Sequence, residues 1–170
     1  MITNLLGLGA MLSLFLLYQQ KNRKNMLLCK LSADVFWIFH YFSLGATAGM
    51  IPNFVGIFRE LVFVNRGSKK WAGSPLWCVL FILVNFSLGV YSFDAWYDMI
   101  PIVASSCVTI SLWIDNPDLT KIISVPVSTA FLIYDIFVLS YVGMINESIA
   151  IVSILIYFVK KALRRKKEHA

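Results

Sequence analysis

Seven apolar segments, each close to the length of a membrane-spanning helix, follow one another along this chain with short linkers between them. A helix needs about 20 apolar residues to cross a hydrocarbon layer about 30 Å thick, and there it must satisfy its own backbone hydrogen bonds. The chain of 170 residues is 59% hydrophobic and 14% charged, whereas soluble domains are about 25% charged. The sequence therefore predicts an all-α membrane protein, a single membrane domain over 1–170 with seven transmembrane helices. The expected helices are Ile2–Gln19, Leu31–Ala48, Met50–Val64, Pro75–Ser92, Met99–Ile114, Lys121–Tyr141 and Asn146–Phe158.

The lysine and arginine residues indicate how the chain lies in the membrane. All but Arg59 fall on one side of a seven-span topology, and cytoplasmic loops are the ones enriched in these residues. We therefore expect a multi-pass membrane protein with its N-terminus outside and its C-terminus and basic tail (161–170) in the cytoplasm. A net charge of +6 distributed in this way does not indicate a nucleic-acid partner. The expected inner residues are Lys21, Arg23, Lys24, Lys30, Arg66, Lys69, Lys70, Lys121, Lys160, Lys161, Arg164, Arg165, Lys166 and Lys167.

Two parts of the sequence resemble each other. The motif Phe36-x-Ile38-x-His40 aligns with Phe131-x-Ile133-x-Asp135, and Gly49-Met50-Ile51 aligns with Gly143-Met144-Ile145 after a slip of one residue. Parallel repeats related by an axis along the membrane normal are one plan for transporters, with the substrate site near the midplane. The alignment predicts two parallel three-helix repeats, 1–66 and 96–160, joined by a linker helix within 67–95 (3+1+3).

The second expected helix carries a stripe of polar and aromatic side chains. Asp34, Trp37 and Tyr41 recur at helical spacing, and His40 lies beside Tyr41. Ionisable groups are costly in lipid and usually face partners inside a helix bundle, and a histidine titrates near physiological pH. We therefore expect Trp37 and His40 to line a solute pocket. The alternative is a packed core histidine that donates to a nearby carbonyl.

The third expected helix places Asn53 and Glu60 close to one face, with Arg59 about 100° away from Glu60. Sequence neighbours do not face each other on a helix, so this spacing predicts that Arg59 reaches a carboxylate on another helix, with Asp135 the leading choice. The rival interpretation is that Arg59 extends towards the inner surface near Arg66.

Two acidic residues stand out in the second repeat. Asp135 lies beside Tyr134 in the middle of the sixth apolar segment. If it is buried and unpaired it would be neutral, and its protonation could couple to substrate movement. The alternative is a structural salt bridge between Asp135 and Arg59. Glu147 begins the seventh segment, where it either caps that helix through the dipole or stands at the mouth of a pocket.

Several residues together carry a resemblance to known membrane carriers. They are His40 followed by Arg59, Met99-Ile100-Pro101, and Tyr134-Asp135 followed by Gly143 and Glu147. With its 3+1+3 plan, the chain resembles the SWEET, PQ-loop and PnuC superfamily of small-solute carriers, and more closely the YgjV-type bacterial inner-membrane proteins, which implies the inner (plasma) membrane of a bacterial cell. Trp37 and Asn53 are similar to the Trp and Asn that line the sugar pocket of SWEET-type carriers. The chain departs from the pattern in lacking a Pro-Gln dipeptide.

These features predict a small polar-solute transporter that works by alternating access at a midplane pocket, with the lipid bilayer and the solute as partners and a homo-oligomer left open. The rival is a non-transporting structural or regulatory membrane protein. No enzymatic activity, metal or cofactor is expected, because Cys29, Cys78 and Cys107 lack paired spacing and no nucleophile motif is present. The expected substrate-binding residues are Trp37, His40, Asn53, Tyr134 and Asp135, with Arg59, Glu60 and Glu147 as charge partners or coupling residues.

Overall fold

The described residues, 2–19, 23–114 and 116–168 of a computed structural model, form seven α-helices and two short 3-10 helices, with no strand among them. This confirms the all-helical prediction and the order of its helices. The α-helices are α1 (Ile2–Gln19), α2 (Arg23–Ser43), α3 (Thr47–Phe63), α4 (Leu76–Tyr91), α5 (Met99–Ile114), α6 (Pro117–Phe137) and α7 (Tyr141–Glu168); the 3-10 helices are η1 (Lys70–Gly73) and η2 (Trp96–Asp98).

Three helical stretches in the described chain are long and apolar enough to cross a membrane: Trp96–Ile114, Asp118–Phe137 and Tyr141–Arg164. Two further helices, Ile2–Leu16 and Leu76–Tyr91, are apolar but shorter. The remaining two, α2 and α3, carry most of the buried ionisable residues, which lowers their hydropathy.

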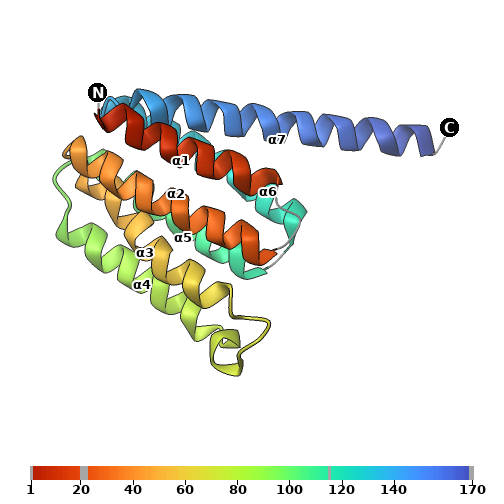
Figure 1. Ribbon diagram of the computed structural model, residues 1–170, viewed down its shortest axis with the longest axis horizontal. Coiled ribbons are helices and arrows are strands. Elements are labelled where there is room, and N and C mark those ends of the chain that lie inside the picture. The colour runs from red at the N-terminus through yellow and green to blue at the C-terminus, as the bar shows by residue number, and fades with distance from the viewer. Residues whose placement is uncertain (1, 20–22, 115, 169–170) are drawn as a thin grey trace.

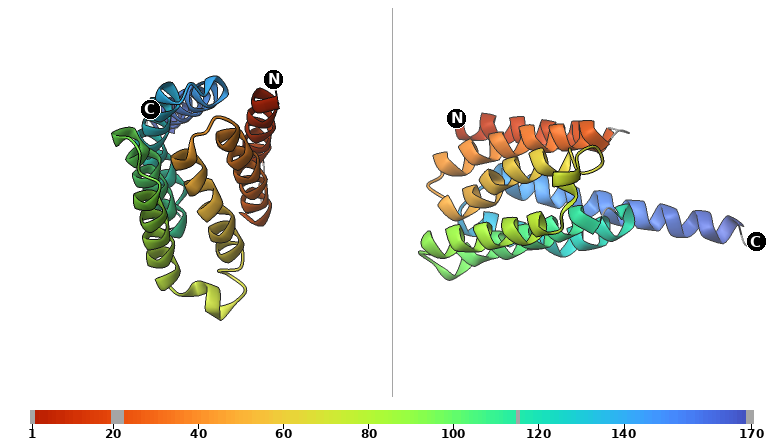
Figure 2. Two further views of the ribbon diagram at one scale, coloured as in Figure 1. Left: turned by 90° about the vertical axis from the view of Figure 1, so that its left-hand side faces the viewer. Right: turned by 90° about the horizontal axis from the view of Figure 1, so that it is seen from below.

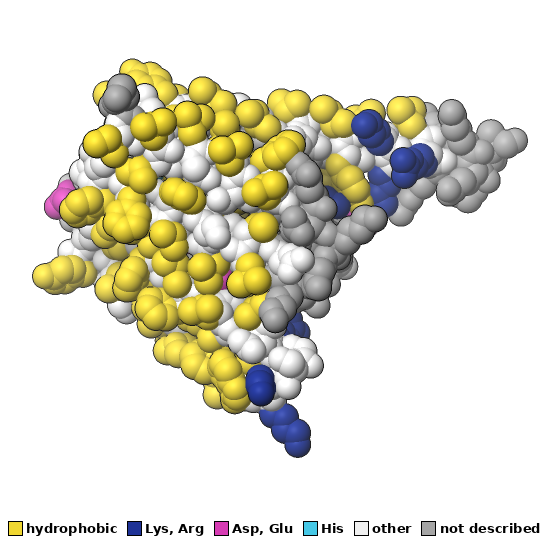
Figure 3. Space-filling view, in the orientation of Figure 1, with side chains coloured by type: hydrophobic (Ala, Val, Ile, Leu, Met, Phe, Trp, Pro, Cys, Tyr) yellow, Lys and Arg dark blue, Asp and Glu magenta, His cyan; other side chains and the backbone are white. Residues whose placement is uncertain are grey.

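The molecule buries many polar groups next to its apolar core and exposes many apolar side chains. Leu, Ile, Val and Phe side chains are exposed along every α-helix, while charged and polar side chains fill much of the interior. Figure 3 shows apolar side chains spread over the visible face and the lysine and arginine side chains gathered towards one end. Soluble proteins almost never bury charged residues fully, so this distribution fits a surface in contact with lipid.

Six helices form a closed ring. In the order α1, α2, α3, α5, α6, α7, each helix packs against the next, and α7 returns to α1 (Figures 1 and 2). The fourth helix lies outside this ring against α3 and α5. The two ends of the chain lie at opposite ends of the bundle, and α7 continues past the other helices (Figure 1). The ring brings the α2–α3 hairpin together with the α6–α7 hairpin.

The turns of these two hairpins have the same backbone pattern. Gly45 has φ 69° and Leu139 has φ 54°, so both are left-handed. The Ala46 amide donates to the Tyr41 carbonyl at 2.9 Å, and the Ser140 amide donates to the Asp135 carbonyl at 2.9 Å.

This match changes the sequence alignment. Tyr41 and Asp135 are 94 residues apart, and the same spacing relates Gly45 to Leu139 and Gly49 to Gly143. An alignment of the two turns with this spacing needs no slip of one residue. In this alignment Tyr41, rather than His40, corresponds to Asp135.

Candidate functional site

Two groups of buried polar side chains contain the residues that the sequence singled out, and a separate cluster lies around Asn85 and Ser106. The first, here the tip network, lies where the two hairpin turns meet the start of α1. The second, here the charged network, lies farther from the hairpin turns, on α2, α3, α5 and α7. The tip network consists of Thr3, His40, Tyr41, Gly49, Tyr134, Asp135 and Ser140, and the charged network consists of Lys30, Asp34, Arg59, Glu60, Thr109 and Glu147.

The centre of the tip network is a hydrogen bond between the hairpins. The Tyr41 hydroxyl on α2 donates to Asp135 Oδ1 on α6 at 2.8 Å, and both side chains are buried, with Asp135 0% exposed. A buried polar group is costly unless it is hydrogen-bonded, so this bond satisfies one carboxyl oxygen of Asp135. Tyr41 therefore holds the carboxylate that the sequence singled out.

A second bond crosses between the hairpins nearby. The Gly49 amide in the first turn of α3 donates to the Tyr134 hydroxyl at 2.8 Å. An added Cβ at Gly49 would lie 2.8 Å from the Tyr134 ring and 2.9 Å from the Tyr41 ring. Only glycine lets the two rings close on this helix end without a shift.

His40 bridges three segments of the chain. Its Nδ1 lies 2.9 Å from the Thr3 carbonyl oxygen, and its Nε2 lies 2.9 Å from Ser140 Oγ. A carbonyl oxygen can only accept, so Nδ1 carries a hydrogen. The ring also makes an edge contact with Trp37 at 5.2 Å between centroids. His40 thus has the geometry of the packed core histidine that was the alternative to a solute ligand.

Ser140 links His40 to the start of α7. Its Oγ accepts from the Gly143 amide at 3.2 Å, which is the arrangement of a helix N-cap. Of the two alternatives for Glu147, the helix cap does not fit, because α7 begins at Tyr141 and Glu147 falls in its second turn.

Arg59 is the clearest correction to the sequence analysis. Its Nη2 lies 3.0 Å from Glu60 Oε1, its Nη1 donates to Thr109 Oγ1 on α5 at 2.9 Å, and it is 2% exposed. Arg59 therefore faces the interior rather than the inner surface, but its partner is Glu60 and not Asp135. Asp135 lies in the last turn of α6, not in the middle of its helix as the sequence predicted, and its neighbour Tyr134 bonds Gly49 in the first turn of α3. Arg59 is ten residues beyond Gly49, a rise of about 15 Å.

Asp34 lies in the same region as this pair. It forms a salt bridge with Lys30 one turn earlier on α2 and is 0% exposed. An added Cβ on Gly56 of α3 would lie 2.5 Å from Asp34 Oδ2 and 3.3 Å from Arg59 Nη2. The sequence placed Lys30 in a linker, whereas α2 begins at Arg23 and carries Lys30 into the bundle.

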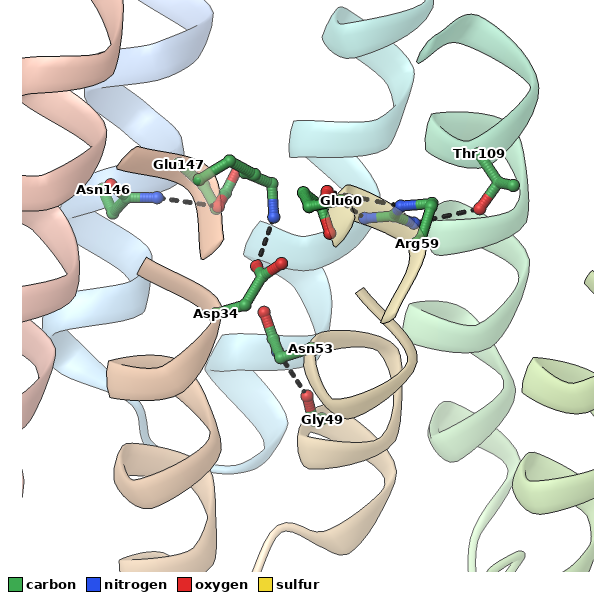
Figure 4. A network of polar contacts seen from close by, with 9 residues as sticks. Asp34, Gly49, Asn53, Arg59, Glu60, Thr109, Asn146 and Glu147 are labelled. Atoms are coloured by element: carbon green, nitrogen blue, oxygen red, sulfur yellow. Dashed lines mark hydrogen bonds and ion pairs between the residues drawn. The ribbon is translucent and has the colours of Figure 1, made fainter. Parts of the chain in front are cut away.

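Two other expected site residues, Asn53 and Glu147, border the tip network: Asn53 bonds its member Gly49, and Glu147 interacts electrostatically with Asp135 and Tyr41. The Asn53 side chain donates to the Gly49 carbonyl of its own helix at 2.8 Å, and Glu147 Oε1 accepts from Asn146 at 2.9 Å. Glu147 also interacts electrostatically with Lys30, the salt-bridge partner of Asp34 (Figure 4 shows Glu147 and Asp34). The structure thus brings Trp37, His40, Tyr134 and Asp135 together and places Arg59, Glu60 and Glu147 in the charged network. The predicted basic residue Lys21 and the side chains from Arg165 onward lie outside the described residues.

Comparison with known proteins shows the family of this chain. The Imp-YgjV family, described as a bacterial inner membrane protein family, matches residues 1–165. No curated protein and no solved structure matches the chain.

Proposed function

We propose that this chain, which belongs to the Imp-YgjV family of bacterial inner membrane proteins, is a multi-pass carrier that moves a small polar solute by alternating access. The observation that carries the proposal is the Tyr41–Asp135 hydrogen bond, which joins corresponding positions of two like hairpins at 2.8 Å. Buried ionisable residues in a membrane bundle usually mark a transport path. The proposed activity needs no covalent chemistry.

The two units of the carrier are α1–α3, within 1–66, and α5–α7, within 96–160, with α4 in the linker 67–95. Two contacts between the units support this division, since α3 packs on α5 and α7 packs on α1. A pseudo-two-fold axis that exchanges the units would exchange these two contacts. The units then have the same orientation because α4 crosses the membrane between them.

All seven helices cross the membrane in this proposal, with the N-terminus outside and the C-terminus in the cytoplasm. The end of the bundle with the α3–α4 connection carries Arg66, Lys69 and Lys70, and the opposite end carries Asp94 and Asp98. Because cytoplasmic loops carry the excess of lysine and arginine, the first end faces the cytoplasm.

The tip network is the proposed solute site in its closed form. Trp37, His40, Tyr134 and Asp135 are each at most 6% exposed. Aromatic walls with a few polar groups suit sugars, nucleosides and vitamins. A rocking motion of the two units would separate Tyr41 from Asp135 and free both groups for the solute.

The second candidate function is a non-transporting structural membrane protein. The observation that favours it is the bonding of His40, whose two ring nitrogens already have partners. In such a protein the tip network would only hold the hairpins together.

A thermal-shift screen of the purified protein against sugars, nucleosides and vitamins tests the proposal, because a ligand that binds the native state raises its Tm. The uptake of a solute found in this way is then measured in proteoliposomes that contain the protein. A carrier in which Asp135→Asn still folds is expected to lose uptake, with Asp94→Asn as the exposed control. Uptake equal to wild type in a folded Asp135→Asn protein removes the proposed mechanism, and unfolding of this variant favours the structural role.

A further inference from the structure

The charged network contains more acidic than basic groups. Lys30 and Arg59 are its two cations, and Asp34, Glu60 and Glu147 are its three carboxylates. Arg59 and Glu60 form one pair, while Lys30 lies near both Asp34 and Glu147. Figure 4 shows the three acidic side chains approaching one region from α2, α3 and α7. With every group ionised, the network holds one uncompensated negative charge.

Two buried oxygens of the network have no hydrogen-bond donor among the described residues. They are Asp34 Oδ2 and Glu60 Oε2, on side chains that are 0% and 1% exposed. Gly56 leaves room for Asp34 Oδ2 at the surface of α3, where a Cβ would lie 2.5 Å from it. A buried carboxylate oxygen without a donor is costly, and a charge left over in a low-dielectric site is more costly still.

We propose that Asp34 reversibly binds a proton on Oδ2. Its carboxylate takes up one proton, the carboxylic acid forms, and the charge of the network changes from one negative to zero. Metal ions suit the site less well, because one oxygen each of Asp34 and Glu60 already bonds a cation and a hard metal ion needs six or more oxygen ligands. No group of three or more His, Cys, Asp or Glu residues that could hold a metal ion occurs in the described parts of the chain.

Three helices place charged groups around the proposed proton site on Asp34. Lys30 is on the same helix, Glu60 and Arg59 face Asp34 from α3, and Glu147 faces Lys30 from α7. Arg59 in turn has two neighbours on other helices: the neutral Thr109 on α5 accepts a hydrogen bond from it, and Cys78 on α4 interacts with it electrostatically.

Protonation of Asp34 has a consequence for the two proposed units. It removes the anion that holds Lys30 on α2 and leaves the Lys30 ammonium with Glu147 on α7. A proton would thereby exchange a contact within the first unit for one between the units. This coupling role rests on the proposed carrier function, whereas proton binding by Asp34 can be measured without it.

Infrared difference spectroscopy of the purified full-length protein in lipid vesicles tests the proton site. Exposed carboxyl groups protonate at roughly pH 4, and the site is expected to add a carboxylic acid C=O band at higher pH. Asp34→Asn is expected to remove that band, and the control Asp94→Asn is expected to keep it. A band that is identical in Asp34→Asn, or one that disappears when sodium replaces choline at fixed pH, overturns the proposal.

A second variant keeps the test decisive if Asp34→Asn does not fold. Glu60→Gln removes a neighbouring negative charge, so the acid band is expected to appear only at lower pH than in the wild type; an unchanged titration overturns the proposal. If the acid band titrates but the uptake of the solute does not depend on pH, the coupling role is contradicted. Absent uptake with an intact band contradicts the carrier function and leaves the proton site standing.

Discussion

Tyr41 donates a hydrogen bond of 2.8 Å to Asp135, and the two residues occupy corresponding positions, 94 residues apart, in two hairpins with the same turn. In the proposed pair of parallel repeats, a contact between equivalent positions would lie on the axis that relates the two units. The same axis would exchange Gly49 with Gly143 and His40 with Tyr134. The rings of His40 and Tyr134 each reach the start of the second helix of the other hairpin. Tyr134 does so directly through the Gly49 amide, and His40 does so through Ser140.

The Tyr41 hydroxyl is expected to contribute to stability. Tyr41→Phe leaves the buried Asp135 Oδ1 without this donor, which is expected to lower the free energy of unfolding by about 1–3 kcal/mol. Thermal unfolding in detergent or lipid measures this change. Tyr141→Phe is the matched control, since Tyr141 is 64% exposed and should leave the Tm as it is. An equal Tm for Tyr41→Phe and wild type would show that the bond contributes nothing.

The left-handed turn residues should respond in opposite ways to substitution. Gly45 has open space around an added Cβ, so Gly45→Ala is expected to cost about 1–2 kcal/mol through its backbone conformation alone. Leu139→Gly relieves the same strain and is expected to raise the stability by about 1 kcal/mol or less. The melting temperatures of both variants check this, with Gly67→Ala, also in open space, as the control. A stable Gly45→Ala protein would contradict the turn geometry.

The partner of Arg59 can be identified by a double-mutant cycle. Arg59→Ala leaves Glu60 buried without its cation and is expected to cost about 3–5 kcal/mol. The double variant Arg59→Ala, Glu60→Ala is expected to be more stable than the sum of the single effects predicts, as for residues in contact. Chemical unfolding measures each free energy. Coupling of Arg59 with Asp135 in place of Glu60 would contradict the structure.

Hydropathy and charge were enough to predict the seven helices and the inward-facing ionisable residues. Trp37, His40, Tyr134 and Asp135 lie together because each falls on an interior stripe close to a hairpin turn. The pairing of charges was harder to predict, since it depends on the height of each residue in the bundle. Arg59 and Glu60 are adjacent in sequence and point in different directions from the helix. The long Arg59 side chain nevertheless brings its guanidinium group back to the Glu60 carboxylate.

The role of Asp34 also required the structure. The apolar pattern suggested a helix beginning at Leu31, whereas α2 begins at Arg23 and thus includes Lys30 as the partner of Asp34. The shared turn of the hairpins was equally hidden. Gly45 and Leu139 have unlike side chains, and the two turns match in their backbone angles and hydrogen bonds instead.

Relative movement of the two helical units is the central claim, and the distance between spin labels measures it most directly. Thr47 and Tyr141 are exposed residues at the starts of α3 and α7. They are suitable label sites once Cys29, Cys78 and Cys107 are replaced. A carrier is expected to give two distance populations between these labels, with their ratio shifted by a solute found in the thermal-shift screen. One narrow distance, unchanged by any such solute, would contradict alternating access.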